Sequence, residues 1–309
     1  MHHEPTKSSL PVIVVTGATG NTGTEVVKQL STVKDVKVRA AVHSLEKARE
    51  LPNGVEVVQM DYTKPETVLS AFTGATKLYL LPPSNPDKVK HTQVMVEAAK
   101  KIGIQYIVNI SGISIDREPI NDVDRIFAQV DSIVTDSGIM YTILRPSWFN
   151  QNFTSPRYFG LQIKQGLLCL PVAEGKTGWV DCRDIAAVAV KALTEMGHEN
   201  KIYNLTGPKA LSTSEVTAIL SSVSGREIKF MDISEESYAQ MLRDFGVPEW
   251  FVQKMVEITR KWRLGAHDDV TQDIEKVTGN KPISFEQFAI DHADLLKQIT
   301  GSKEEVLTT

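Results

Sequence analysis

Short apolar runs alternate with helix-like stretches along the first half of the chain. The runs are apolar at consecutive positions, which is typical of strands buried on both faces. A helix-like stretch follows each run, so the pattern predicts a parallel sheet with helices on both sides. Right-handed crossovers then give a Rossmann-type, doubly wound sheet of the α/β class. The predicted strands are 12–15, 36–42, 55–60, 77–81, 105–110 and 140–146.

The rhythm breaks after Pro146, where residues 147–166 have no strand period. A strand edge and a helix return near residue 179, and the chain is mostly helical from Ser212 onward. We therefore expect two domains. The Rossmann domain is predicted to comprise residues 10–147 plus 176–196, and a smaller, mainly helical C-terminal substrate domain comprises 148–175 plus 197–303.

Composition narrows the class of protein. The chain has 309 residues, of which 41% are hydrophobic and 23% charged, as in ordinary globular proteins. The net charge is −4 and no basic tract occurs, so we expect no nucleic-acid or membrane partner. Two cysteines, Cys169 and Cys182, are too few for a disulfide framework and favour a reduced, cytoplasmic protein. No apolar stretch is long enough to span a bilayer, and residues 1–10 lack the apolar core of a signal peptide.

The segment "TGATGNTG" follows the first predicted strand and opens a helix. Gly17 allows a tight turn, Gly20 leaves room for a pyrophosphate, and Gly23 permits close packing of the helix. The N–H groups at the start of the helix then face the anion. The alternative is a structural turn without a ligand. Further donors are expected from Thr19, Asn21 and Thr22.

The end of the second strand distinguishes the two nicotinamide dinucleotides. A carboxylate there would bind the ribose 2′-OH and repel a 2′-phosphate. This chain has His43 and Ser44 at that point, with Lys47 one turn further on. Protonated His43 and Lys47 suit a phosphate, so the sequence favours NADP(H) over NAD(H). Alternatively, both are ordinary solvated residues.

Two further strand ends carry candidate cofactor residues. After the third strand, Asp61 is expected to accept from the adenine amino group, with Tyr62 near the base. Asp61 is equally well interpreted as the N-cap of the next helix. After the fourth strand, Leu81 and Pro82 are expected beside the nicotinamide ribose, and the prolines stiffen that rim.

The segments "TGATGNTG", "VRAAVHSLEKA", "YTILRPSWFNQNF" and "VDCRDIA" together resemble the NmrA-like branch of the atypical short-chain dehydrogenases/reductases. C-terminal segments such as "DFGVPEWFVQKM" and "VTGNKPISFEQFAIDHA" are similar to festuclavine and agroclavine dehydrogenases and to bacterial azo- and quinone reductases. The resemblance implies a bound NAD(P)H and hydride transfer to a small conjugated acceptor: a quinone, azo compound, iminium or activated alkene. No metal is expected. The family commonly has a basic residue where this chain has His43.

Catalysis departs from the standard pattern of the superfamily, in which a serine acts with a Tyr-x-x-x-Lys pair. Ser111 matches the serine position and is the candidate catalytic residue, although a serine at a strand end is also a common loop residue. The tyrosine and lysine positions fall near Val123 and Phe127, which do no acid–base chemistry. Two hypotheses follow: an oxidoreductase whose acceptor needs no strong protein acid, or a non-catalytic redox sensor that acts through a protein partner.

The segment "RPSWFNQNF" is predicted to face the nicotinamide and the acceptor. Pro146 is expected near the carboxamide of the nicotinamide, and Ser111 is also expected to contact the cofactor. The aromatic rings and amide groups of this segment suit a flat acceptor. The alternative is that the aromatic rings only pack between two domains. Downstream, residues 249–265 form an amphipathic helix that packs in the core, covers the acceptor or meets a partner subunit. The predicted acceptor-binding residues are Trp148, Phe149, Asn152 and Phe153.

Overall fold

The computed structural model describes residues 10–155 and 158–298, and it confirms the predicted Rossmann-type sheet. The strand order is β3-β2-β1-β4-β5-β6-β9, and the pairings from β3 through to β5 are parallel. The first strands of the chain therefore lie in the centre, as in doubly wound folds. The strands are β1 (Val12–Thr16), β2 (Lys37–Val42), β3 (Glu56–Gln59), β4 (Lys77–Leu80), β5 (Tyr106–Ile110), β6 (Met140–Pro146) and β9 (Lys201–Leu205).

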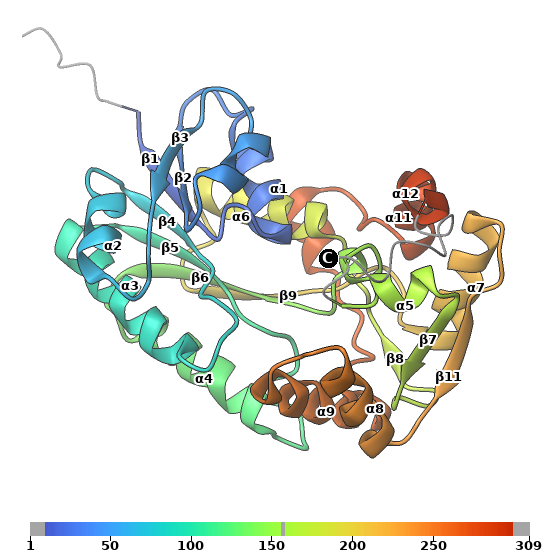
Figure 1. Cartoon of the computed structure of the whole chain (residues 1–309). Helices are drawn as coiled ribbons and strands as arrows, with labels where there is room; N and C mark the ends of the chain where they lie inside the picture. Colours follow the sequence, from blue (N-terminus) through green and yellow to red (C-terminus); the bar gives the residue numbers. More distant parts are fainter. Residues whose placement is uncertain (1–9, 156–157, 299–309) are drawn as a thin grey trace, which may run out of the picture. The chain divides into compact units, whose positions relative to one another are not determined.

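Helices cover both faces of this sheet. Figure 1 shows α1 and α6 on one face and α2, α3 and α4 on the other. The continuous apolar runs are explained by this double cover, because Ile13, Val14 and Val15 are all fully buried. These helices are α1 (Asn21–Leu30), α2 (Pro65–Phe72), α3 (Lys88–Ile102), α4 (Asp122–Thr135) and α6 (Cys182–Thr194).

The stretch after β2 differs from the expected helix. It forms only a short 3-10 helix, η1 (Glu46–Glu50), which buries no side chain. A short helix without an apolar face has nothing to stabilise further turns in water. Strand β9 forms the other edge of the sheet, next to β6. The predicted domain boundary at 196/197 had placed its residues in the smaller domain.

The described chain divides into two compact units. The first unit contains residues 10–110, 130–143 and 186–202, and the second contains residues 111–129, 144–185 and 203–298. The predicted domain boundaries stay a prediction, and residues 299–303 lie outside the described residues.

The second unit is mainly helical. Its core contains Phe153, Trp179, Trp262 and Phe288, and α7 begins with a capping box formed by Ser212 and Glu215. Strand β7 (Leu167–Leu170) pairs in parallel with β11 (Lys229–Asp232), and β8 (Lys176–Thr177) pairs antiparallel with β10 (Leu211–Ser212). The helices are η2 (Asn150–Phe153), α5 (Gly160–Lys164), α7 (Thr213–Ser224), α8 (Glu235–Asp244), α9 (Glu249–Arg263), α10 (Asp273–Thr278), α11 (Phe285–Asp291) and α12 (Ala293–Gln298).

Neither Cys169 nor Cys182 is part of a disulfide in the described structure; Cys182 is buried and Cys169 half-buried. Among the described residues, no helix combines the length and the apolar character that crossing a membrane requires.

Candidate functional site

The glycine loop, residues 16–23, joins β1 to α1 in the first unit, and its three glycines differ in what surrounds them. Gly17 has φ = +62°, and a Cβ there would lie 2.9 Å from Cδ2 of Leu81. A Cβ on Gly23 would lie 2.1 Å from the carbonyl oxygen of Gly17, so this position excludes any side chain. A Cβ on Gly20 would meet that oxygen at 3.3 Å and no other atom within 4 Å. Gly17 and Gly23 thus close the loop, and Gly20 leaves its outer face open.

The start of α1 has the features of an anion site. Gly20 is the N-cap, no side chain of the described residues caps the helix, and the first turn carries no acidic residue. The first N–H groups and the helix dipole therefore favour an anion at this end. Thr19, Gly20 and Asn21 are exposed, whereas Thr22 is buried. The open face over Gly20 fits the pyrophosphate of a dinucleotide.

The tip of β2 is basic and polar. His43 and Lys47 are exposed and Ser44 is half-buried. The carbonyl oxygen of His43 accepts a hydrogen bond from Nε2 of Gln59 at 3.2 Å, which ties this tip to β3.

After β3, Asp61 and Tyr62 are held by local contacts. The Asp61 carboxylate accepts from the hydroxyl and the N–H of Thr63 at 2.7 and 2.9 Å, and these bonds lower its pKa. The N-cap of α2 is Lys64, so the alternative interpretation of Asp61 as that cap is wrong. Burial raises the pKa of Tyr62 to about 12, against a smaller lowering by the backbone N–H of Gly17, which donates a hydrogen bond to the Tyr62 hydroxyl oxygen. Tyr62 therefore lies against the glycine loop.

Leu81 and Pro82 follow β4. The N–H of Leu81 donates to Oγ1 of Thr16 at 2.8 Å, and its side chain packs on Gly17. The carbonyl oxygen of Pro82 accepts from Nζ of Lys88 at 3.3 Å. The structure thus brings Gly17, Tyr62 and Leu81 together around one loop of the first unit.

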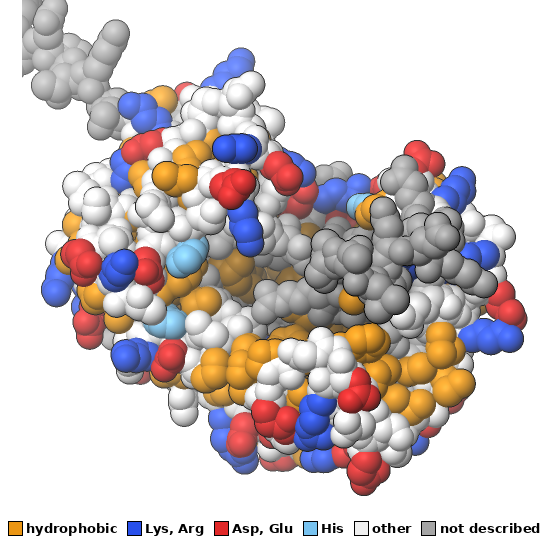
Figure 2. Space-filling view, viewed as in Figure 1, with side chains coloured by type: hydrophobic (Ala, Val, Ile, Leu, Met, Phe, Trp, Pro, Cys, Tyr) orange, Lys and Arg blue, Asp and Glu red, His pale blue; other side chains and the backbone are white. Residues whose placement is uncertain are grey.

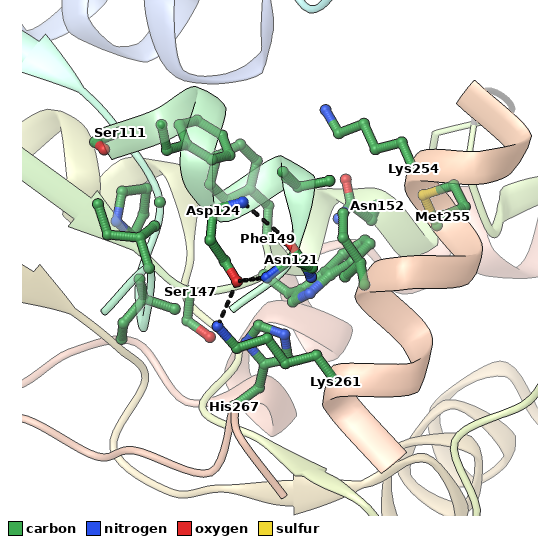
Figure 3. A pocket seen from close by; sticks show the side chains of 18 of the residues that line it. Ser111, Asn121, Asp124, Ser147, Phe149, Asn152, Lys254, Met255, Lys261 and His267 are labelled. Carbon is green, nitrogen blue, oxygen red and sulfur yellow. Dashed lines mark hydrogen bonds and ion pairs between the residues drawn. The ribbon is translucent and has the colours of Figure 1, made fainter. Parts of the chain in front are cut away.

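The second unit contains a cavity of about 180 Å³. Cavities of roughly 150 Å³ take up a benzene ring, so this space suits a small flat molecule. The lining comes from the segments after β5 and β6, the start of α4, one face of α9 and His267 (Figure 3). The predicted site residues that line it are Ser111, Pro146, Trp148, Phe149 and Asn152.

Phe153 differs from the prediction. It is fully buried in the core, with its ring 4.8 Å from that of Trp179 and 5.1 Å from that of Phe285. It lies on η2, and that short helix directs Asn152 to the cavity and Phe153 to the core. Trp148 belongs to both surroundings, because its ring also stacks on Phe159 at 5.9 Å.

The expected positions of a tyrosine–lysine pair also line this cavity. Val123 and Phe127 lie one turn apart on α4 and contribute apolar surface to it. Nowhere in the sequence is a tyrosine followed four residues later by a lysine.

A buried ion pair lies in the cavity wall. Nζ of Lys261 lies 2.7 Å from Oδ2 of Asp124 and donates to the carbonyl oxygen of Ser114 at 2.6 Å. Asp124 also exchanges backbone-to-side-chain hydrogen bonds with Asn121, in the pattern of a capping box at the start of α4. Lys261 is 2% exposed and Asp124 5%, so each compensates a charge that would otherwise be costly to bury.

Three further polar side chains in the cavity lining are buried and have no hydrogen-bond partner among the described residues: Ser111, Ser147 and His267. Burial, and then the charge of Lys261, lower the pKa of His267 to about 4. His267 is therefore neutral at physiological pH. Buried groups of this kind normally have a partner, so their hydrogen-bonding capacity is left for a ligand or water.

Sequence reasoning missed Asp124, Lys261 and His267. Helix α9 presents Phe251, Met255 and Ile258 to the cavity at helical spacing, and the periodicity of residues 249–265 was a usable signal. Nothing in the sequence around His267 marks it, because its importance comes from distant neighbours.

A second hollow of about 300 Å³ lies beside α8 and α9. It shares Tyr158 and Phe251 with the cavity, and their rings lie 6.2 Å apart. Figure 2 shows hydrophobic side chains gathered over these two helices. Phe245, the C-cap residue of α8, is 49% exposed.

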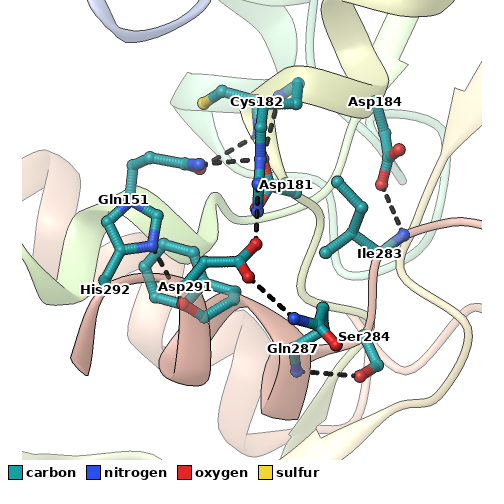
Figure 4. A network of polar contacts seen from close by, with 11 residues as sticks. Gln151, Asp181, Cys182, Asp184, Ile283, Ser284, Gln287, Asp291 and His292 are labelled. Carbon is teal, nitrogen blue, oxygen red and sulfur yellow. Dashed lines mark hydrogen bonds and ion pairs between the residues drawn. The ribbon is translucent and has the colours of Figure 1, made fainter.

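A polar network holds η2, which carries Asn152 (Figure 4). Gln151 donates to Asp181 at 2.9 Å and accepts from the N–H of Cys182 at 3.0 Å. Burial raises the pKa of Asp181, but hydrogen bonds from Arg183 and Gln151 outweigh it and leave the pKa lowered. Burial raises the pKa of Asp184 to about 6, and its carboxylate accepts from the N–H of Ile283 at 2.7 Å.

Comparison with known proteins agrees with these observations. The model of the NmrA-like family matches residues 10–289. An NAD(P)H azoreductase of Xenophilus azovorans is 36% identical over 286 residues, which cover 91% of this chain and 98% of the relative. Agroclavine dehydrogenase of Claviceps fusiformis is 26% identical over 295 residues, or 92% and 98% of the two chains. An NADPH-dependent quinone oxidoreductase of Escherichia coli, solved with NADPH, superposes with a TM-score of 0.80 at 26% identity, covering 90% and 98%. The resemblance found in the sequence is confirmed, and the chain belongs to the NmrA-like family.

Proposed function

We propose that the protein is an NAD(P)H-dependent oxidoreductase that reduces a small conjugated acceptor. The observation that carries this proposal is the uncapped start of α1 beneath the open face of Gly20. The names of an azoreductase, an agroclavine dehydrogenase and a quinone oxidoreductase among the relatives support the same chemistry.

The glycine loop would hold the pyrophosphate through backbone N–H groups at the start of α1. Asp61 and Tyr62 would hold the adenine, and Leu81 and Pro82 the nicotinamide ribose. Ser111 follows β5 and Pro146 ends β6, so the rule that ligands bind at the carboxyl ends of parallel strands favours them as nicotinamide contacts. The remaining proposed contacts are Thr19, Asn21, Thr22, His43, Ser44 and Lys47.

We further propose a preference for NADP(H). His43 and Lys47 are exposed after β2, where an NAD-specific protein would place a carboxylate. Lys47 forms no ion pair with the described part of the chain, so its ammonium is available to a 2′-phosphate.

The acceptor would bind in the cavity between the rings of Trp148 and Phe149 and the face of α9. The chemistry that NAD(P)H would supply when bound is a hydride for an electron-poor atom of the acceptor, and water would provide the proton that completes the reduction. With Val123 and Phe127 at the positions expected for the tyrosine and the lysine, we propose that the cavity contributes by orienting the acceptor and excluding water.

The test mixes the purified protein with NADPH or NADH and with quinones, azo dyes and iminium compounds, and follows nicotinamide absorbance. Turnover of at least one acceptor is expected. Binding of both dinucleotides with no turnover of any acceptor would instead favour a non-catalytic sensor. No binding by calorimetry at millimolar dinucleotide would overturn both.

A further inference from the structure

The cavity has a cluster of polar side chains at one end, and most of the remaining lining is apolar. Figure 3 draws Ser147, Lys261 and His267 at one end, and Lys254 and Met255 elsewhere. We call Ser147 and His267, together with the Lys261–Asp124 pair, the polar end of the cavity. The rest of the lining includes the apolar side chains of Trp148, Phe149, Phe127 and Ile258, and the polar side chains of Ser111, Asn152 and Lys254.

We propose that Ser147 and His267 recognise the hydrogen-bond-accepting atom of an uncharged, flat acceptor, and that the cavity discriminates against cations. This inference rests on the proposed function and assigns specificity within it. Ser147 is 4% exposed and His267 8%, and neither side chain has a partner among the described residues. Leaving such groups without partners is costly, so a ligand atom that satisfies them gains affinity.

Charge points the same way. Asp124 is the one carboxylate among the described residues that line the cavity, and Lys261 already occupies it. Lys254 adds a second positive charge to the lining, above the ring of Phe251. The Lys261–Asp124 pair is neutral overall, so a bound cation would find no unpaired carboxylate among the described lining residues and would share the cavity with the Lys254 ammonium. An iminium is a poorer fit than a neutral carbonyl or ring nitrogen.

His267 acts as a neutral hydrogen-bond donor. Burial and Lys261 depress its pKa most, Asp269 and Asp268 oppose this, and Arg117 adds to it. With a pKa of about 4, the imidazole keeps one N–H for an acceptor oxygen throughout the neutral range. When hydride reaches the conjugated carbon of an enone or quinone, the carbonyl oxygen becomes an oxyanion. The N–H and the Ser147 hydroxyl stabilise that charge until water protonates it.

The experiment compares four bicyclic probes of similar size, titrated by tryptophan fluorescence without cofactor. Two carry an acceptor atom (1,4-naphthoquinone and quinoline), one has none (naphthalene), and one is cationic (N-methylquinolinium). We expect naphthoquinone and quinoline to bind at least tenfold more tightly than the other two. Tighter binding of N-methylquinolinium than of quinoline would overturn the proposal.

Variants assign the effect to the residues. His267→Phe keeps a ring of similar shape and should weaken naphthoquinone binding about tenfold while leaving naphthalene unchanged. His267→Gln, which keeps a neutral donor, should recover binding to within about threefold of the wild type. Equal losses for naphthoquinone and naphthalene in His267→Phe would reduce His267 to a packing residue and overturn the proposal. A circular dichroism spectrum and a Tm equal to those of the wild type check that each variant is folded.

A pH series tests whether His267 is neutral when the ligand binds. Naphthoquinone binding should stay flat from pH 5.5 to 8, and a midpoint near 6.5 would contradict a neutral His267. The two levels of inference fail separately. If the probes bind selectively but no acceptor oxidises NADPH, the proposed oxidoreductase activity is wrong and the proposed recognition by Ser147 and His267 stands. If an acceptor turns over equally well in the wild type and in His267→Phe, the activity stands and the recognition is wrong.

Discussion

The glycine loop and the cavity are built by opposite means. The loop exposes Gly20 and Asn21 and offers backbone N–H groups, with no acidic side chain in the first turn of α1. The cavity buries Asp124 and Lys261 and offers side chains from segments far apart in the sequence. The glycine loop can bind a ligand only where no side chain covers its backbone N–H groups. The cavity is stable only if its buried charges are compensated. The two regions should therefore fail differently when mutated.

The largest expected effect concerns the buried pair. Lys261→Met leaves Asp124 charged without its partner, which should lower the free energy of unfolding by about 3–5 kcal/mol. Urea unfolding measures it. The matched double variant Lys261→Met/Asp124→Asn removes both charges and should recover at least half of the loss. If the single variant is as stable as the wild type, the cavity does not depend on compensated charge and the comparison fails.

The loop should respond through binding rather than stability. Gly20→Val places a side chain on the open face, and we expect the Kd for NADPH to rise more than 100-fold, about 3 kcal/mol. Its Tm should stay close to that of the wild type. Gly23→Val is the contrasting variant: its side chain collides with the Gly17 carbonyl, so both Tm and binding should fall. Equal losses of Tm in the two variants would show that Gly20 also has a structural role.

Asp184 makes the second unit sensitive to pH. Its pKa in the folded protein is about 6, above the ordinary value of 3.8, so the folded state binds the proton more tightly. The stability from this group is therefore present at low pH and is lost as pH rises from about 4 to 6. Asp184→Asn keeps the bond to Ile283 and should gain roughly 2 kcal/mol at pH 7.5. Chemical unfolding of the wild type and of Asp184→Asn at pH 5 and 7.5 measures this gain. A gain in the free energy of unfolding that is the same at both pH values would contradict the prediction.

The smallest expected effect lies at the tip of β2. Lys47→Ala should weaken NADP(H) binding five- to tenfold and leave NAD(H) binding unchanged, because only the former carries a 2′-phosphate. Calorimetry with both dinucleotides measures it, and the loss should shrink at high salt. Lys34→Ala, also exposed, serves as the control. Equal losses for both dinucleotides would count against a role for Lys47 at that phosphate.

The sequence predicted the central sheet because each strand is buried on both faces and leaves a continuous apolar run. It also predicted the separate tasks of Gly17, Gly20 and Gly23, since the spacing of glycines reflects a local turn. The sequence did not predict that the stretch after β2 forms only the short helix η1, because a charged segment without an apolar face gives no signal for where a helix ends. The burial of Phe153 in the core was not predicted either, because the adjacent residues Asn152 and Phe153 on η2 point to different surroundings.

The sequence by itself determined the family, the parallel sheet and the open backbone turn after β1, because these follow from local periodicity and from residues close together in the chain. Only the tertiary structure decided that Lys261 neutralises Asp124 and that His267 stays unpartnered beside them. Burial and charge compensation are properties of neighbours more than a hundred residues apart, and no local pattern encodes them.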